Sequence, residues 1–151
     1  MNLLERLVMS RGGASMMLIR VLVGAVFLSE GIQKFLFSAS LGVGRFVKIG
    51  IPHPGFTAPF VGVVEIVCGA MIVAGLLTRV AAIPLLINIS VAIATTKVPM
   101  LLHQGFWPMA HEARVDFCMF LGLVFLAIEG AGRWSFDQRI GQPNQRGTPR
   151  Q

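Results

Sequence analysis

The sequence predicts an all-α fold, a four-helix bundle that crosses a membrane several times with both termini in the cytoplasm. Two observations predict this class. The chain of 151 residues is 54% hydrophobic and only 13% charged, whereas a soluble domain carries about 25% charged residues. Its apolar residues also gather into segments near the ~20 residues that a spanning helix needs. The length leaves room for one membrane domain, which we place at residues 1–140.

Four such segments can be drawn, and turn-forming residues separate them. The second and third are divided only by Thr78 and Arg79, so they should form an antiparallel hairpin. The fourth is short, and we expect it to take Glu112 and Ala113 as its first turn. The predicted helices cover, to within a few residues, 15–37, 58–77, 80–102 and 112–130.

The positive charges predict the orientation of these helices, because loops that stay in the cytoplasm are enriched in Lys and Arg. When the four predicted helices are drawn across a membrane, Arg45 and Lys48 lie on one side of it, and Lys97 lies near the same surface. The opposite side, which we assign to the cytoplasm, has seven arginines: Arg6, Arg11, Arg79, Arg133, Arg139, Arg146 and Arg150. The Gln-, Pro- and Gly-rich residues 141–151 are then expected to form a disordered cytoplasmic tail.

Glu65 is the most informative single residue, because it lies inside a long apolar run where a carboxylate is costly. Such a residue usually faces the interior of a helix bundle and has a partner there. At ~1.5 Å of helix rise per residue, charges from all four helices fall within a band roughly 10 Å thick. These residues are Glu30, Lys34, Glu65, Lys97 and Asp116. We predict that they line a ligand-binding pocket.

Glycines accompany these charges at helical spacing. Gly24 and Gly31 share a face of the first helix, and Gly62 and Gly69 flank Glu65 on the second. Small residues let membrane helices approach closely, and we expect these four to keep open a seam into which Glu65 points. The apolar walls of the predicted pocket are Phe27, Met71 and Phe120.

The same charges have a purely structural interpretation, in which ion pairs fix how the helices pack. Glu30 and Lys34 are spaced i,i+4, which lets them meet on one face of a helix. Arg20 is expected either to anchor the cytoplasmic side or to pair with Glu65. The structural pairs considered on this interpretation involve Arg20, Glu65, Glu112 and Arg114. The sequence leaves open whether the charges bind a ligand or only pair with one another.

Several motifs together resemble the DoxX family of small bacterial membrane proteins. The first helix carries Arg20-x3-Gly24-x2-Phe27-x3-Gly31-x2-Lys34. The next two helices carry Gly50-Ile-Pro52 and then Glu65-x3-Gly69-x5-Gly75-Leu-Leu-Thr-Arg79-x-Ala-Ala82. The last helix and its exit carry His111-Glu112-Ala-Arg114-x-Asp116 and Gly130-x-Gly132-Arg133-Trp134-Ser135-x-Asp137. The resemblance covers about residues 16–140, and Cys68 departs from it where the family often has a second glycine.

The resemblance implies a multi-pass protein of the bacterial inner membrane. It also implies a quinone-linked redox membrane subunit that works with a soluble partner, with ubiquinone or menaquinone as the ligand and no covalently bound cofactor. The alternatives are a membrane scaffold without chemistry of its own and, less well supported, a small transporter. Neither the reaction nor any catalytic residue is identified, and a homo-oligomer is left open.

Other kinds of site find little support in the sequence. Cys68 and Cys118 are isolated thiols inside apolar segments, where cysteine usually behaves as a small hydrophobe. His53, His103 and His111 match no zinc-site spacing, so no metal is expected. The net charge of +6 does not indicate nucleic acid, because the cations lie at the ends of apolar runs and no nucleic-acid motif accompanies them.

Overall fold

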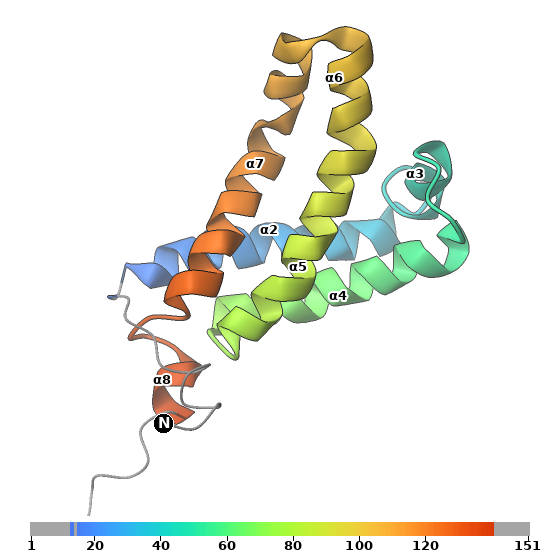
Figure 1. Cartoon of the computed structure of the whole chain (residues 1–151). Helices are drawn as coiled ribbons and strands as arrows, with labels where there is room; N and C mark the ends of the chain where they lie inside the picture. Colours follow the sequence, from blue (N-terminus) through green and yellow to red (C-terminus); the bar gives the residue numbers. More distant parts are fainter. Residues whose placement is uncertain (1–12, 14, 141–151) are drawn as a thin grey trace, which may run out of the picture.

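The computed structural model describes residue 13 and residues 15–140, and every regular element in this part of the chain is helical (Figure 1). The predicted all-α class is thus confirmed. The predicted tail at 141–151 lies outside the described residues. In chain order the elements are α2 (Met16–Leu36), α3 (Val43–Lys48), α4 (Pro54–Ala74), α5 (Thr78–Ala92), the π-helix η1 (Ile93–Lys97), α6 (Val98–Gln104), α7 (Phe106–Glu129) and α8 (Phe136–Ile140).

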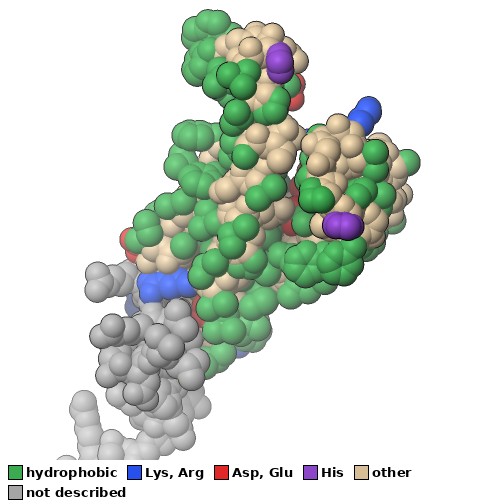
Figure 2. All heavy atoms as spheres, turned by 45° about the vertical axis from the view of Figure 1, so that its right-hand side comes forward, with side chains coloured by type: hydrophobic (Ala, Val, Ile, Leu, Met, Phe, Trp, Pro, Cys, Tyr) green, Lys and Arg blue, Asp and Glu red, His purple; other side chains and the backbone are tan. Residues whose placement is uncertain are grey.

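Three helical segments are long and apolar enough to cross a membrane: Met16–Leu36, Pro54–Ala74 and Thr78–Gln104. Their large apolar side chains point outward, as Leu18 and Leu102 do with 73% and 76% of their surface exposed. Figure 2 shows hydrophobic side chains spread over the visible face of the helices. In a soluble protein such a surface would aggregate, whereas a bilayer covers it.

The fourth predicted segment corresponds to α7, which starts at Phe106 and is longer than the sequence suggested. Its 24 residues could cross a bilayer by length. It is not among those three segments, and Glu112, Arg114 and Asp116 place three charges in its first half. A fourth crossing and the cytoplasmic placement of both termini therefore stay predictions.

The helices α2 and α4 run side by side, and glycines explain how close they come (Figure 1). A Cβ atom added to Gly24 would lie 2.8 Å from the carbonyl oxygen of Gly69. One added to Gly31 would lie 2.7 Å from the carbonyl oxygen of Gly62. The expectation that these glycines hold a seam open is therefore wrong. They close the α2–α4 contact by letting the two backbones touch.

The helices α5 and α7 form a second antiparallel pair that crosses the first at a large angle (Figure 1). The turn between α4 and α5 is as tight as predicted, and Gly75 and Leu77 both have positive φ there. The predicted antiparallel packing of these two helices is wrong, because α5 leaves the turn at a large angle to α4 and packs against α7 (Figure 1). The apolar core lies where the two pairs cross, and its fully buried side chains are Val23, Ile72, Ala82, Leu85, Leu123 and Leu126. Away from this crossing the pairs diverge, which leaves room between their far ends.

The third span is interrupted by the π-helix η1, which the sequence analysis did not predict. The amide of Val98 donates to the carbonyl of Ile93, five residues back. Pro99 follows directly, and a proline ring clashes with the carbonyl four residues before it, here that of Thr95. Widening the preceding turn relieves this clash, and such π-turns often occur at functional sites.

The close α2–α4 contact can be tested with one added methyl group. Gly31→Ala should lower the free energy of unfolding by about 1–3 kcal/mol, since the new Cβ would overlap the α4 backbone. Gly55→Ala is the matched control on α4, because nothing lies within 4 Å of its added Cβ. Thermal unfolding of the detergent-solubilised protein measures both variants. A Gly31→Ala protein that melts at or above the wild-type temperature would contradict the packing.

Candidate functional site

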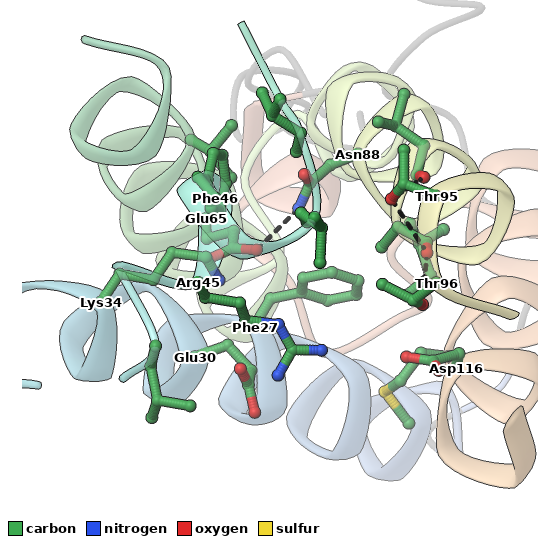
Figure 3. A pocket seen from close by; sticks show the side chains of 18 of the residues that line it. Phe27, Glu30, Lys34, Arg45, Phe46, Glu65, Asn88, Thr95, Thr96 and Asp116 are labelled. Carbon is green, nitrogen blue, oxygen red and sulfur yellow. Dashed lines mark hydrogen bonds and ion pairs between the residues drawn. The ribbon is translucent and has the colours of Figure 1, made fainter. Parts of the chain in front are cut away.

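A cavity of about 560 Å³ lies between the two helix pairs on the side where they diverge. Residues of α2, α3, α4, α5, η1 and α7 line it. All five side chains of the predicted pocket are among them, together with further polar residues (Figure 3). The polar lining consists of Glu30, Lys34, Arg45, Thr57, Glu65, Asn88, Thr95, Thr96, Lys97, Glu112 and Asp116. The structure thus brings the band of charges together, and ligand binding there stays a prediction.

Glu65 is the most enclosed charged group of the cavity, with 4% of its surface exposed. The ammonium of Lys34 lies 2.6 Å from its Oε2 atom. The amide nitrogen of Asn88 donates to its Oε1 atom over 2.6 Å. Both carboxylate oxygens are therefore bonded, one from α2 and the other from α5. The i,i+4 spacing predicts Lys34 within reach of Glu30, but the partner of Lys34 in the structure is Glu65. Glu30 is exposed at the cavity wall.

A second ion pair joins Lys97 and Asp116 at the wall formed by η1 and α7. Their charged atoms are 3.1 Å apart, and 27% of the Asp116 side chain is exposed. Thr95 and Thr96 precede Lys97 in the π-turn, and their hydroxyls donate to backbone carbonyls of Val91 and Ala92 at 2.8 and 2.6 Å. Thr95, Thr96 and Lys97 all line the cavity, and Figure 3 shows Thr95 and Thr96 at its wall.

Arg45 is the main cavity residue that the sequence analysis did not assign to the site. It was treated only as a charge of the external loop. In the structure that loop contains α3, whose Phe46 is buried with 7% of its surface exposed. Burial of Phe46 holds α3 against the bundle, and Arg45 then extends into the cavity (Figure 3). The signal available in the sequence was Arg45 next to an aromatic residue, Phe46, in the loop between two apolar segments.

The apolar walls are partly as predicted. Phe27 lines the cavity, whereas Met71 and Phe120 pack against the core instead. Met71 lies six residues beyond Glu65, which places it ~9 Å further along α4, towards α8. The apolar lining near the charges comes from Val26, Phe27, Val61, Ile89 and Met119.

Arg20 does not pair with Glu65, so that expectation is wrong. Its guanidinium donates to the carbonyls of Ala131, Trp134 and Val73 over 2.6, 2.8 and 3.1 Å. These carbonyls lie at the end of α4 and in the segment after α7. Val73 is eight residues beyond Glu65, or ~12 Å along the helix. Arg20 therefore anchors the end of the molecule opposite the cavity. That this end is cytoplasmic, the other part of the expectation, stays a prediction.

Glu112 and Arg114 also differ from the predicted structural pair. Arg114 donates to the carbonyl of His111 over 2.6 Å. Glu112 lines the cavity and makes no hydrogen bond or ion pair with the described residues. Of the predicted structural ion-pair residues, Glu65 alone has a partner of opposite charge within 4 Å in this part of the chain.

The thiols and histidines form no centre in the described structure. Cys68 packs against the core from α4, and Cys118 is exposed on α7. Within residue 13 and residues 15–140, no group of three or more His, Cys, Asp or Glu side chains is placed to hold a metal ion. The polar groups that the cavity offers to a ligand include the carboxylate of Glu65, the cations of Lys34 and Arg45 and the amide of Asn88.

Comparison with known proteins gives one family model and two similar relatives. The DoxX family model matches residues 15–98. The chain is 54% identical to the "Uncharacterized membrane protein Rv3486" of Mycobacterium tuberculosis over 143 residues, which are 91% of this chain and 88% of that protein. It is 25% identical over 132 residues to the "Putative oxidoreductase CatD" of Bacillus subtilis, covering 87% of this chain and 91% of that protein. No solved structure matches.

The Glu65–Lys34 pair can be tested by a double-mutant cycle. Glu65→Gln should lower the free energy of unfolding by about 3 kcal/mol, since it leaves the Lys34 charge buried without its counter-charge. Adding Lys34→Met should restore most of the loss, because the pair is then removed together. Melting curves of the two single variants and the double variant give the coupling.

The more exposed pair supplies the control for this cycle. Asp116→Asn should cost about 1 kcal/mol or less, because partly exposed ion pairs contribute little. Equal losses for Glu65→Gln and Asp116→Asn, or a wild-type melting curve for Glu65→Gln, would contradict a central role for Glu65.

Proposed function

Because this chain belongs to the DoxX family of membrane proteins, we propose that it is a quinone-binding membrane subunit of a redox complex. In this proposal a soluble partner supplies the electrons. The observation that carries the proposal is the cavity, in which Lys34, Glu65 and Arg45 meet apolar walls from Phe27 and Ile89.

A quinone head group is a flat apolar ring with two carbonyl oxygens that accept hydrogen bonds. A site for it needs cationic or amide donors beside an apolar slot. Lys34 and Arg45 are such donors, and Phe27 and Val61 supply apolar surface next to them. The cavity of about 560 Å³ falls within the ~300–1,000 Å³ typical of small-molecule sites. The donor set and the size both fit a quinone head group.

Each cavity residue then has a defined task. Asn88 and Lys34 hold the Glu65 carboxylate in one position, from α5 and α2 respectively. Glu65 in turn fixes the Lys34 ammonium at the cavity wall, where it can donate to a ligand carbonyl. A bound quinone would supply the electron-accepting chemistry, and Glu65 and Lys34 are the groups placed to hold and pass a proton.

A soluble electron donor and a bacterial plasma-membrane location complete the proposal. CatD, one of the two bacterial relatives, carries the word oxidoreductase in its name. The arginines near α8 favour a cytoplasmic position for that end. The cavity would then open towards the outer half of the membrane.

One observation favours a non-catalytic scaffold as the second candidate. Lys34 is paired with Glu65, and Lys97 is paired with Asp116, so each of these four charges has a counter-charge within the described structure. Four of the cavity charges could therefore serve packing alone. Against this, Arg45, Glu30 and Glu112 face the same cavity without such partners in the described part of the chain, and helix packing gives no reason to keep them.

Quinone binding is testable by thermal shift in detergent. Short-chain ubiquinone or menaquinone analogues should raise the melting temperature of the wild type by a few degrees. Arg45→Gln should abolish most of this shift without changing the basal melting temperature, because the side chain of Arg45 bonds no described residue. Lys48→Gln is the matched control, since Lys48 lies on the same short helix and does not line the cavity.

Two results would favour the scaffold. One is the absence of a shift for any quinone over a range where a known quinone protein responds. The other is an equal loss of the shift in Arg45→Gln and Lys48→Gln, which would place binding outside the cavity. Lys34→Met is a second variant, and its quinone-induced shift is measured against its own melting temperature without quinone.

The proposed orientation predicts which residues an impermeant thiol reagent reaches in intact cells. In a background without Cys68 and Cys118, a cysteine at Lys48 or Gln104 should react from outside, because both side chains are exposed at the far ends of the helix pairs. A cysteine at Arg139 should react only after the membrane is permeabilised. The reverse pattern would overturn the orientation.

A further inference from the structure

A second hollow, of about 460 Å³, lies at the opposite end of the molecule from the cavity. It is formed where the start of α2 and the end of α4 meet the segment that leads into α8. The residues that line it and carry the argument are Met17, Ala74, Arg133, Trp134, Phe136 and Arg139. None of them lines the cavity of the proposed function.

The hollow lies at the boundary of the membrane. Met17 is the second residue of α2 and Ala74 is the last residue of α4, and both helices are long and apolar enough to span. Trp134 and Phe136 border the hollow with 69% and 52% of their surfaces exposed. Exposed aromatic side chains at the ends of spanning helices are typical of the layer that holds the lipid head groups.

Two arginines give this boundary hollow its charge. Arg133 and Arg139 are both exposed and line it, and neither bonds a carboxylate within the described chain. The guanidinium of Arg139 lies 5.7 Å from the ring centre of Phe136. The adjacent acid, Asp137, is only 1% exposed, and its two oxygens accept the amides of Leu77 and Thr78. Neither arginine therefore has a carboxylate bonded to it within the described structure.

The backbone that carries the arginines is fixed to the spanning helices. Arg20 on α2 bonds the carbonyls of Ala131 and Trp134, on either side of Arg133. The amide of Asp137 donates to the carbonyl of Gly75 at the end of α4 over 2.9 Å. The backbone on both sides of the two arginines is thus fixed at the rim of the hollow in advance, which lowers the entropy cost of binding an anion there.

We propose that this hollow binds the head group of an anionic phospholipid of the surrounding bilayer. The phosphate would lie between the guanidinium groups of Arg133 and Arg139, whose planar donor sets match phosphate oxygens. The glycerol and the first acyl carbons would lie against Met17, Ala74 and Trp134. Basic pockets between spanning helices at the cytoplasmic surface recognise lipid head groups in this way. A free phosphate ion could bond the two arginines but would not use the apolar side chains of the hollow.

The test compares two lipids with identical acyl chains added to delipidated, detergent-solubilised full-length protein. Phosphatidylglycerol should raise the melting temperature several degrees more than phosphatidylcholine does. The double variant Arg133→Gln/Arg139→Gln should lose this difference while keeping the response to phosphatidylcholine. The double variant Arg45→Gln/Lys48→Gln removes the same charge at the other end and should keep the difference.

Native mass spectrometry gives a second readout that does not depend on stability. Wild-type protein should retain phosphatidylglycerol at collision energies that remove phosphatidylcholine, and the Arg133/Arg139 variant should release both alike. If the two lipids behave alike on wild-type protein, the proposal is wrong. An equal loss in the Arg45/Lys48 variant would show general charge attraction instead of a site. Equal stabilisation by inorganic phosphate would show an anion site that does not recognise lipid.

Discussion

The burial of one carboxylate, Glu65, organises the half of the molecule that contains the cavity. A charge in an apolar helix is costly unless it is fully bonded. Both of its oxygens are bonded here, one by Lys34 from α2 and the other by Asn88 from α5. Because these partners come from different helix pairs, the carboxylate joins α4 to α2 and to α5. The cavity forms beside this junction, where the two pairs diverge.

In the other half of the molecule, charged side chains bond backbone groups at the ends of helices. Arg20 satisfies three backbone carbonyls that no helix supplies with a donor, and Asp137 accepts the first amides of α5. Terminal groups of helices need partners when they are shielded from water. These two side chains provide the partners and tie the chain after α7 to α2 and α4. The hollow bordered by Arg133 owes its fixed shape to these bonds.

The two sites therefore lie at opposite ends of a single apolar core. Between them Val23, Ile72, Leu85 and Leu123 are almost completely buried, and α2 and α4 touch along their glycines. A close-packed interior transmits force with little deformation. The proposed quinone site would thus be held at a fixed distance from the lipid contact at the other surface. That arrangement suits a subunit that must present a membrane-soluble ligand at a constant depth.

The sequence by itself determined the class of protein and most of the charged residues around the cavity. Hydropathy predicted the apolar helices, because the bilayer requires a certain length and composition. Charges such as Glu65 and Lys97 stood out because an apolar segment contains few of them. Depth along a helix follows from residue number, so the band of charges could be predicted without any contact being known.

Only the tertiary structure decided which of these charges meet. Lys34 lies one turn from Glu30 on its own helix, but the rotation of α2 against α4 directs it to Glu65. Residue spacing along a single helix does not fix how two helices are rotated against each other. Arg20 does not reach Glu65, because it bonds the carbonyl of Val73, ~12 Å further along α4. Arg45 was missed because its position depends on how α3 folds back, which the buried contact of Phe46 decides. The sequence determines local periodicity and depth, whereas the pairing of side chains depends on how the helices pack.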